Sequence, residues 1–256
     1  MRQPSIVAVG VRRAAAAAGP LAVSALAGLV SGCESTQDTS ARLQREGAKA
    51  ISHERGLVIT AKNPDVSIVR TAVLSDQNGT AAVVILRNRK PAPLGVVPIA
   101  INVLGRGGKS VFKNNTPGLE PSLVSTAALP PGGELAWVND QVTPSGKAVA
   151  VKAEAGTGGT GAPRMLPKIE IGTPKVINDP TSGLEVTGSI TNRSSLPQLK
   201  IFIYVVGWRG GSIVCAGRGA IQRLNPAAHV AFHVYPIGNP HDASRFTIAA
   251  PPTVLR

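Results

Sequence analysis

The sequence predicts an all-β protein that is built from two similar halves. Short segments rich in Val and Ile recur along the chain, and the gaps between them hold Asn-Gly, Gly-Gly and Pro, which are typical of turns. The 28 glycines and 21 prolines follow no triplet period, so they indicate a turn-rich chain rather than a collagen-like one. Landmarks of one half also recur in the same order in the other half.

The composition is that of a chain that can fold. At 256 residues, with 43% apolar and 16% charged residues, it holds enough apolar side chains to build a core. Aromatic residues make up 3%, so we expect cores of Val, Ile, Leu and Ala. Two cysteines exclude a disulfide-dense secreted scaffold.

Residues 1–32 show the order of features found in an export signal. Residues 1–13 carry three arginines and no acid, and residues 14–30 are apolar and uncharged. As a helix, that apolar run spans about 26 Å, which is short for the ~30 Å apolar core of a bilayer. A cleaved signal is therefore favoured over a permanent transmembrane anchor. The pair Arg12 and Arg13 leaves the twin-arginine export route open beside the general route.

The signal ends in Val30, Ser31, Gly32 and Cys33, which resemble a bacterial lipobox. The resemblance implies cleavage before Cys33, a thioether link from its sulfur to diacylglycerol, and acylation of its amine. Two or three acyl chains anchor a protein stably to a membrane. We therefore expect a lipoprotein on the outside of the cell membrane, or on the outer membrane of a bacterium that has two. A plain cleaved signal with an incidental cysteine is the alternative.

The charge of the chain suits an anionic envelope. The formal net charge is +13, and removal of the signal takes away three arginines and no acid. The remaining basic residues are scattered, without a run of five and without interleaved aromatics, so we expect no nucleic-acid partner. An exported basic protein meets anionic lipid headgroups and anionic wall polymers. A solvated basic surface that limits self-association is the simpler interpretation.

Two polar segments divide the chain. Residues 33–63 are interpreted as a polar tether, with a short helix near residues 41–51. Residues 155–167 are rich in Gly, Thr and Pro and are interpreted as a flexible linker that gives the protein reach. Two β-rich domains remain, at 64–154 and 168–254.

An internal repeat relates these two domains. Asn88 is matched by Asn192 at an offset of 104 residues, and Gly107 by Gly210 at an offset of 103, so one residue is missing from the turn between them. Six landmarks of this kind keep the same order, which predicts a tandem duplication.

Each domain is predicted to hold seven short strands. Those of the first are 68–74, 81–87, 96–104, 109–113, 122–127, 133–138 and 147–153. Those of the second are 169–177, 184–190, 199–207, 211–216, 219–223, 228–234 and 245–249. About seven strands in ~85 residues, with a turn every 8–12 residues, predict an immunoglobulin-like β-sandwich in each domain.

Alternation within the long apolar strand predicts which residues enter the core. In the first domain, Ile99, Ile101 and Val103 share one face. Their counterparts in the second domain, at an offset of 103 residues, are Phe202, Tyr204 and Val206.

The order of these segments resembles FxLYD-type and related immunoglobulin-like domains of bacterial surface lipoproteins. A strand, an Asn-containing turn, a long apolar strand, a Gly-rich hairpin and a Leu-Pro-Gly-like turn precede an aromatic strand. Residues 101–105 (INVLG) and 204–208 (YVVGW) stand where the Phe-x-Leu-Tyr-Asp core would be, and both lack its Asp. The resemblance implies the sandwich fold and a cell-surface location, and it carries no catalytic residues.

Residues that carry chemistry are few and dispersed. His229 and His233 are four apart in an alternating strand, which separates them by about 13 Å, too far to share one metal ion. We expect them on the solvent face, opposite Phe232. Cys215 has no cysteine partner if Cys33 is lipidated, and we expect it to be a small buried apolar residue, with a reactive thiol near a histidine as the alternative. We expect no catalytic residue, no metal ligand and no cofactor apart from the lipid on Cys33.

The two tryptophans are the largest aromatic side chains. Trp137 matches Phe232 in the repeat, so we expect it in a core. Trp208 and Arg209 lie at a predicted hairpin tip, where exposed aromatics are candidates for binding. They are the candidate partner-binding residues, and ordinary packing at the end of the sandwich is the alternative.

The expected function is that of a membrane-anchored, non-enzymatic binding module for a protein or an anionic envelope polymer. An envelope-assembly or metal-handling chaperone would need clusters of Met or His, and the chain has two Met and four His. An enzyme with a site between the two domains would need convergent titratable groups, which the sequence does not display. Both remain as alternatives.

Overall fold

The computed structural model describes residues 40, 42–44, 46–47, 55–158, 164–181 and 183–255. Met1–Arg45 and Glu46–Arg256 are two separate compact units. The predicted export signal and Cys33 lie outside the described residues. Residues 40, 42–44 and 46–47 are helical, which agrees with the short helix predicted near 41–51. No helix in the described ranges is both long enough and apolar enough to cross a membrane.

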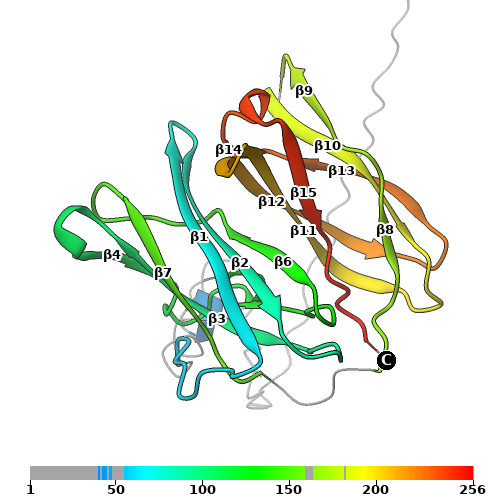
Figure 1. Cartoon of the computed structure of the whole chain (residues 1–256), viewed down its shortest axis with the longest axis horizontal. Coiled ribbons are helices and arrows are strands. Elements are labelled where there is room, and N and C mark those ends of the chain that lie inside the picture. The colour runs from blue at the N-terminus through cyan, green and yellow to red at the C-terminus, as the bar shows by residue number, and fades with distance from the viewer. Residues whose placement is uncertain are drawn as a thin grey trace, which may run out of the picture. The chain divides into compact units, whose positions relative to one another are not determined.

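The Glu46–Arg256 unit is all-β, as the sequence predicts (Figure 1). Its first half holds two antiparallel sheets: β1-β2-β6, and a sheet in which β4, β5 and β7 all pair with β3. The strands are β1 (Val66–Asp76), β2 (Gly79–Asn88), β3 (Val97–Leu104), β4 (Ser110–Lys113), β5 (Ser125–Thr126), β6 (Glu134–Asn139) and β7 (Ala150–Ala155). Two short 3₁₀ turns interrupt them, η1 (Arg106–Gly108) and η2 (Pro121–Leu123).

The second half also holds two antiparallel sheets. In one sheet β10 pairs with β8, β9 and β13, and the other has the order β14-β12-β11-β15. The strands are β8 (Ile169–Ile171), β9 (Lys175–Asp179), β10 (Gly183–Asn192), β11 (Gln198–Arg209), β12 (Ser212–Leu224), β13 (His229–Val234), β14 (Ile237–Gly238) and β15 (Arg245–Ala249). The turn η3 (Pro240–Asp242) precedes β15.

The two halves pair their strands in the same order. The sheet β1-β2-β6 corresponds to β9-β10-β13, and β4-β3-β7 corresponds to β12-β11-β15. This is the arrangement that the predicted duplication requires.

A buried asparagine ends the equivalent strands β2 and β10. Asn88 and Asn192 are both fully buried. The Asn88 side-chain amide donates to the carbonyls of Ala92 (2.8 Å) and Pro130 (3.1 Å), and its oxygen accepts from a backbone N–H two residues later. Asn192 makes the same set of bonds, to the carbonyls of Leu196 (2.7 Å) and Leu224 (3.0 Å) and from Ser194. Each amide thereby satisfies the backbone of a turn that would otherwise be left without partners in the interior.

The predicted alternation holds in β3, but its counterpart in β11 is shifted by one residue. Ile99, Ile101 and Val103 are buried in the first half. In the second half, the residues that pack against the β10 sheet are Ile201, Ile203 and Val205. The proposed counterparts Phe202, Tyr204 and Val206 therefore lie on the opposite face of β11. A one-residue slip in a strand alignment moves every side chain to the other face, and the offset of 103 introduced that slip.

The opposite face of β11 is covered by the first half, so the two halves share one core. Tyr204 and Val206 belong to the same hydrophobic cluster as the residues of β2 and β6. Both β2 and β6 are buried on their two faces, and both contact strands of the second half. The sheet β1-β2-β6 thus lies between the β3 sheet and the β11-β12 sheet (Figure 1).

Several predicted boundaries differ from the structure, among them 169–177, which is two strands, β8 and β9. The segments 211–216 and 219–223 are one continuous strand, β12, and most of 122–127 is a 3₁₀ turn followed by a two-residue strand. The predicted linker begins inside folded structure, because Gly156 donates to the carbonyl of Pro98 (2.9 Å) and Thr157 to that of Ala61 (3.1 Å). Hydrogen bonds to backbone far away in the sequence determine where these strands and the linker begin and end, so local composition does not predict those boundaries.

Candidate functional site

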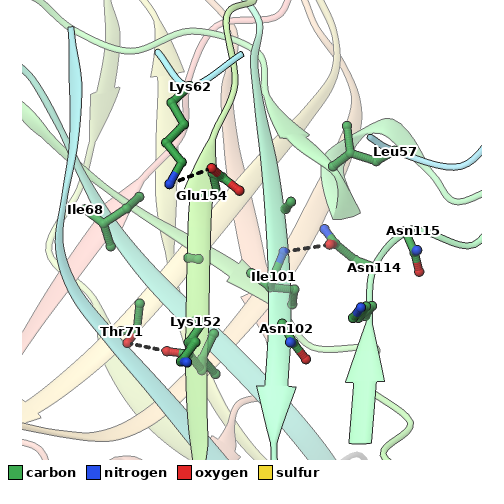
Figure 2. A pocket seen from close by; sticks show the side chains of 14 residues that line it. Leu57, Lys62, Ile68, Thr71, Ile101, Asn102, Asn114, Asn115, Lys152 and Glu154 are labelled. Atoms are coloured by element: carbon green, nitrogen blue, oxygen red, sulfur yellow. Dashed lines mark hydrogen bonds and ion pairs between the residues drawn. The ribbon is translucent and has the colours of Figure 1, made fainter. Parts of the chain in front are cut away.

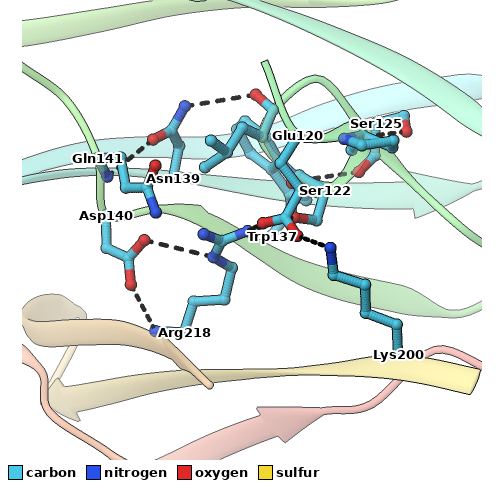
Figure 3. A network of polar contacts seen from close by, with 11 residues as sticks. Glu120, Ser122, Ser125, Trp137, Asn139, Asp140, Gln141, Lys200 and Arg218 are labelled. Atoms are coloured by element: carbon cyan, nitrogen blue, oxygen red, sulfur yellow. Dashed lines mark hydrogen bonds and ion pairs between the residues drawn. The ribbon is translucent and has the colours of Figure 1, made fainter. Parts of the chain in front are cut away.

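The strand β6 holds a loop of the first half at the interface with the second. The Trp137 indole donates to the carbonyls of Ser122 (2.9 Å) and Ser125 (3.2 Å). The side-chain amide of Asn139 donates to the carbonyl of Leu123 (3.3 Å). These bonds fasten the loop that contains η2 to β6 (Figure 3). The loop then presents its polar side chains to the second half.

Arg218 of β12 is the centre of the polar network at this interface. Its guanidinium donates to the carboxylates of Asp140 (3.3 Å) and Glu120 (3.0 Å) and to the hydroxyl of Ser122, and its backbone N–H donates to Asp140 (3.1 Å). Figure 3 shows the Arg218 side chain reaching from the second half between these two acids. Its side chain is 6% exposed. An ionised group this far from water is stable only when partners compensate its charge, and both acids come from the other half.

Lys200 of β11 completes the network from the rim. Its ammonium forms an ion pair with Glu120 and lies 5.9 Å from the centre of the Phe202 ring. Arg218 lies over the same ring at 5.1 Å. Lys200 has a φ of +48°, a left-handed conformation that costs about 1–3 kcal/mol for a residue with a side chain. Two cations and two anions meet here, so the network as a whole is neutral.

The two acids respond differently to burial. Burial opposes ionisation of Glu120, but the hydrogen bond from Lys200 and the charge of Arg218 outweigh it, and the pKa of Glu120 is lowered. Burial also opposes ionisation of Asp140, and there the charge and hydrogen bonds of Arg218 offset it incompletely, so the pKa of Asp140 is raised. The folded protein therefore stabilises the ionised form of Glu120, whereas it destabilises the ionised form of Asp140.

A small apolar cavity lies beside this network. Its volume is about 170 Å³. Both halves contribute to its walls, which are formed by Val96, Pro121, Ser122, Ser125, Ala127, Phe202, Tyr204, Pro251 and Thr253. The cavity therefore exists only while the two halves are packed together.

The Tyr204 hydroxyl is an uncommitted polar group in this cavity. The Tyr204 residue is 1% exposed, and burial raises the pKa of its phenol. No described residue forms a hydrogen bond with its hydroxyl. Among the described residues, every side-chain nitrogen or oxygen that is sealed from solvent has a hydrogen-bond partner. The Tyr204 hydroxyl is therefore not fully sealed from solvent, and Tyr204 lines the cavity.

A larger, more open groove of about 680 Å³ lies on the first half (Figure 2). Its polar groups are largely engaged: Lys62 pairs with Glu154 at 2.9 Å, and the Thr71 hydroxyl donates to the carbonyl of Val151 at 2.8 Å. The buried Asn114 is also satisfied, because its side chain bonds the backbone of three other residues. The groove thus offers exposed lysines but no buried group in need of a partner, and it is the weaker candidate.

The structure places the predicted binding pair in two different environments. Trp208 is 8% exposed, so the expectation of an exposed tryptophan at a hairpin tip is wrong, and the alternative of ordinary packing agrees with the structure. The guanidinium groups of Arg70 and Arg245 lie over its ring, at 5.7 Å and 4.7 Å from the ring centre, and its indole donates to Thr247 (3.0 Å). The first half covers it, which hairpin position alone did not reveal. The Arg209 side chain is 66% exposed and lies 3.7 Å from Asp242.

The other predicted positions agree with the structure. Trp137 and Phe232 are buried, and so is Cys215, whose burial raises the pKa of its thiol to about 11. His229 and His233 are exposed on β13 and bond Thr191 and Glu185, respectively, by their Nδ1 atoms. No group of three or more His, Cys, Asp or Glu side chains able to hold a metal ion occurs within the described ranges.

Sequence reasoning missed Glu120, Asp140, Lys200 and Arg218 as a group. A weak signal exists, because Asp140 and Arg218 continue faces that otherwise carry small apolar residues, such as Val138 and Ala216. A charge at the end of an apolar face indicates a buried partner, but the partner lies 78 residues away.

No family model matches the chain, and no curated protein is significantly similar to it.

Proposed function

We propose that this chain is a membrane-anchored, extracytoplasmic protein that binds a partner molecule without transforming it, and that the cavity between its two halves is the binding site. The location rests on the export signal and on Cys33, which resemble those of bacterial lipoproteins. The net positive charge would keep the protein close to anionic lipid headgroups or wall polymers.

The observation that supports a binding role is the joint construction of the cavity. Ligand sites are commonly apolar hollows at the junction of two structural units, with a few placed polar groups. Here Pro121 and Ala127 come from one half, and Phe202 and Tyr204 come from the other. The neutral network around Arg218 holds the two halves together next to it.

The same geometry gives little support to catalysis at this place. A general acid or base needs a free titratable group within reach of the substrate. Glu120, Asp140 and Arg218 are instead committed to one another, and the pKa of Tyr204 is raised rather than lowered.

Recovery of bound compounds tests this function. The full-length chain is purified gently from its own membranes, denatured, and the released small molecules are identified by mass spectrometry. Ala127→Phe fills the cavity, and Ala150→Phe, at an exposed position, is the matched control. We expect a compound that is enriched with the wild-type and Ala150→Phe proteins and lost with Ala127→Phe. Equal recovery from all three proteins would remove the cavity as the binding site.

A further inference from the structure

We infer that the cavity recognises a neutral ligand group about the size of one aromatic ring, which carries a single hydrogen-bonding oxygen or nitrogen, and that Tyr204 is the residue that reads it. This inference rests on the proposed function, because it specifies the class of ligand for the same site.

The size of the group follows from the cavity volume. The volume is about 170 Å³. Apolar protein cavities of about 150 Å³ hold one benzene molecule, so one ring with one further heavy atom fits here. The walls formed by Phe202, Pro121 and Val96 favour such an apolar body.

The single hydrogen bond follows from the polar side chains of the cavity. The Ser122 hydroxyl lies between Glu120 and Arg218, and the Ser125 hydroxyl donates to the carbonyl of Pro121 (2.8 Å). The Thr253 hydroxyl donates to the carbonyl of Leu199. Tyr204 is more than nine-tenths buried, lines the cavity, and has no hydrogen bond from a described residue. It is the hydroxyl that a ligand can satisfy.

Neutrality follows from the surrounding charges. Arg218 is paired with Glu120 and Asp140, and Lys200 is paired with Glu120. An ionised ligand would lose its hydration and find no uncommitted counter-charge among the residues that line the cavity.

Phenol, toluene and benzoate test this inference as a matched set of probes. They present the same ring with a hydroxyl, a methyl group or a charge, and their binding to the full-length chain is measured by ligand-observed NMR. Tyr204→Phe removes the hydroxyl and keeps the ring. Tyr235→Phe, at the other tyrosine of the chain, which is 51% exposed, is the control.

We expect phenol and toluene to bind the wild-type chain and benzoate to bind at least tenfold more weakly. In Tyr204→Phe we expect the affinity for phenol to fall about fivefold relative to that for toluene, which is the effect of one neutral hydrogen bond. Tyr235→Phe should leave both affinities unchanged. Retained binding of toluene shows that the variant is folded and its cavity open.

Three results would overturn the inference. If Tyr204→Phe changes the affinities for phenol and toluene equally, the Tyr204 hydroxyl does not form a hydrogen bond with the ligand. Binding of toluene would still support the cavity as a binding site. If benzoate binds as well as phenol, the ligand class is not neutral. If no probe binds and Ala127→Phe loses no compound in the recovery experiment, the proposed function fails together with the inference.

Discussion

Asp140 accepts two hydrogen bonds from Arg218, one from the backbone N–H (3.1 Å) and one from the guanidinium (3.3 Å). The bond from the backbone N–H fixes the carboxylate relative to the backbone of β12. The bond from the guanidinium brings the negative charge of Asp140 next to the positive charge of Arg218. One side chain of the first half therefore fixes both the backbone and the charge of a residue in the second half.

Two matched substitutions in the network should show opposite dependence on pH. Because the pKa of Glu120 is lowered, its ionised form stabilises the fold, and this stabilisation is lost as the pH falls through and below its ordinary value of 4.5. Because the pKa of Asp140 is raised, its contribution is present below its ordinary value of 3.8 and is lost as the pH rises through the folded-state value.

We therefore expect the stability deficit of Glu120→Gln, relative to the wild-type protein, to grow from about pH 3 to pH 7. The stability of Asp140→Asn relative to the wild-type protein should rise over the same range. Urea unfolding at a series of pH values measures both slopes. If the relative stabilities of the two variants changed with pH in the same direction, the opposite pKa shifts of Glu120 and Asp140 would be contradicted.

The shared core predicts that the two halves unfold together. The chain has two tryptophans. Trp208→Phe leaves Trp137, which reports on the first half, and Trp137→Phe leaves Trp208, which reports on the contact between the halves. Far-UV circular dichroism on each variant reports on the whole chain. In each variant, tryptophan fluorescence and circular dichroism should give the same urea midpoint. A fluorescence transition clearly displaced from the circular-dichroism transition would mean that the halves unfold separately.

Trp208 should matter for stability more than Arg209. Trp208→Ala removes a buried ring from the contact between the halves, and we expect it to lower the free energy of unfolding by about 3–5 kcal/mol. Arg209→Ala removes an exposed side chain, and we expect a change within about 0.5 kcal/mol. Chemical denaturation measures both. Similar small effects for the two variants would show that Trp208 does not contribute to the core in solution.

Cys215 should be unreactive in the folded protein. It is fully buried, and burial raises the pKa of its thiol to about 11, so little thiolate exists near neutral pH. Iodoacetamide at mildly alkaline pH should label Cys215 only after denaturation, as peptide mass spectrometry can show. Ser212→Cys, at an exposed position, serves as the positive control. Rapid labelling of Cys215 in the native state would point to the reactive alternative.

Cys33 should carry the lipid. Cells that express the wild-type chain in the presence of labelled palmitate should give a labelled protein in the membrane fraction. Cys33→Ala should abolish the palmitate label and the added mass of the lipid, because the thiol that accepts the diacylglycerol is absent. Cys215→Ala is the matched control and should label like the wild type. Equal labelling of the wild type and Cys33→Ala would exclude a lipid anchor at this cysteine.

The sequence predicted local features well where a residue type has one dominant role. Spacing predicts that Asn88 and Asn192 are equivalent, and both end a strand with the same hydrogen bonds. Alternation alone predicts an exposed face for His229 and His233, and both are exposed. For Trp208 the expected exposure is wrong, whereas the alternative of ordinary packing agrees with its burial, which depends on Arg70 and on the sheet that carries it, far away in the chain.

The amino-acid sequence is enough to predict the all-β class, most of the strands, and the matching order of segments in the two halves. These follow from alternation and from turn residues, which act within a few neighbours. Which strand faces meet depends on tertiary packing. Alternation tells that Ile203 and Tyr204 point to opposite sides of β11, but which side meets the first half depends on packing across the whole chain. The same packing created the cavity and brought Arg218 to Asp140, so the candidate site is a property of the assembled halves.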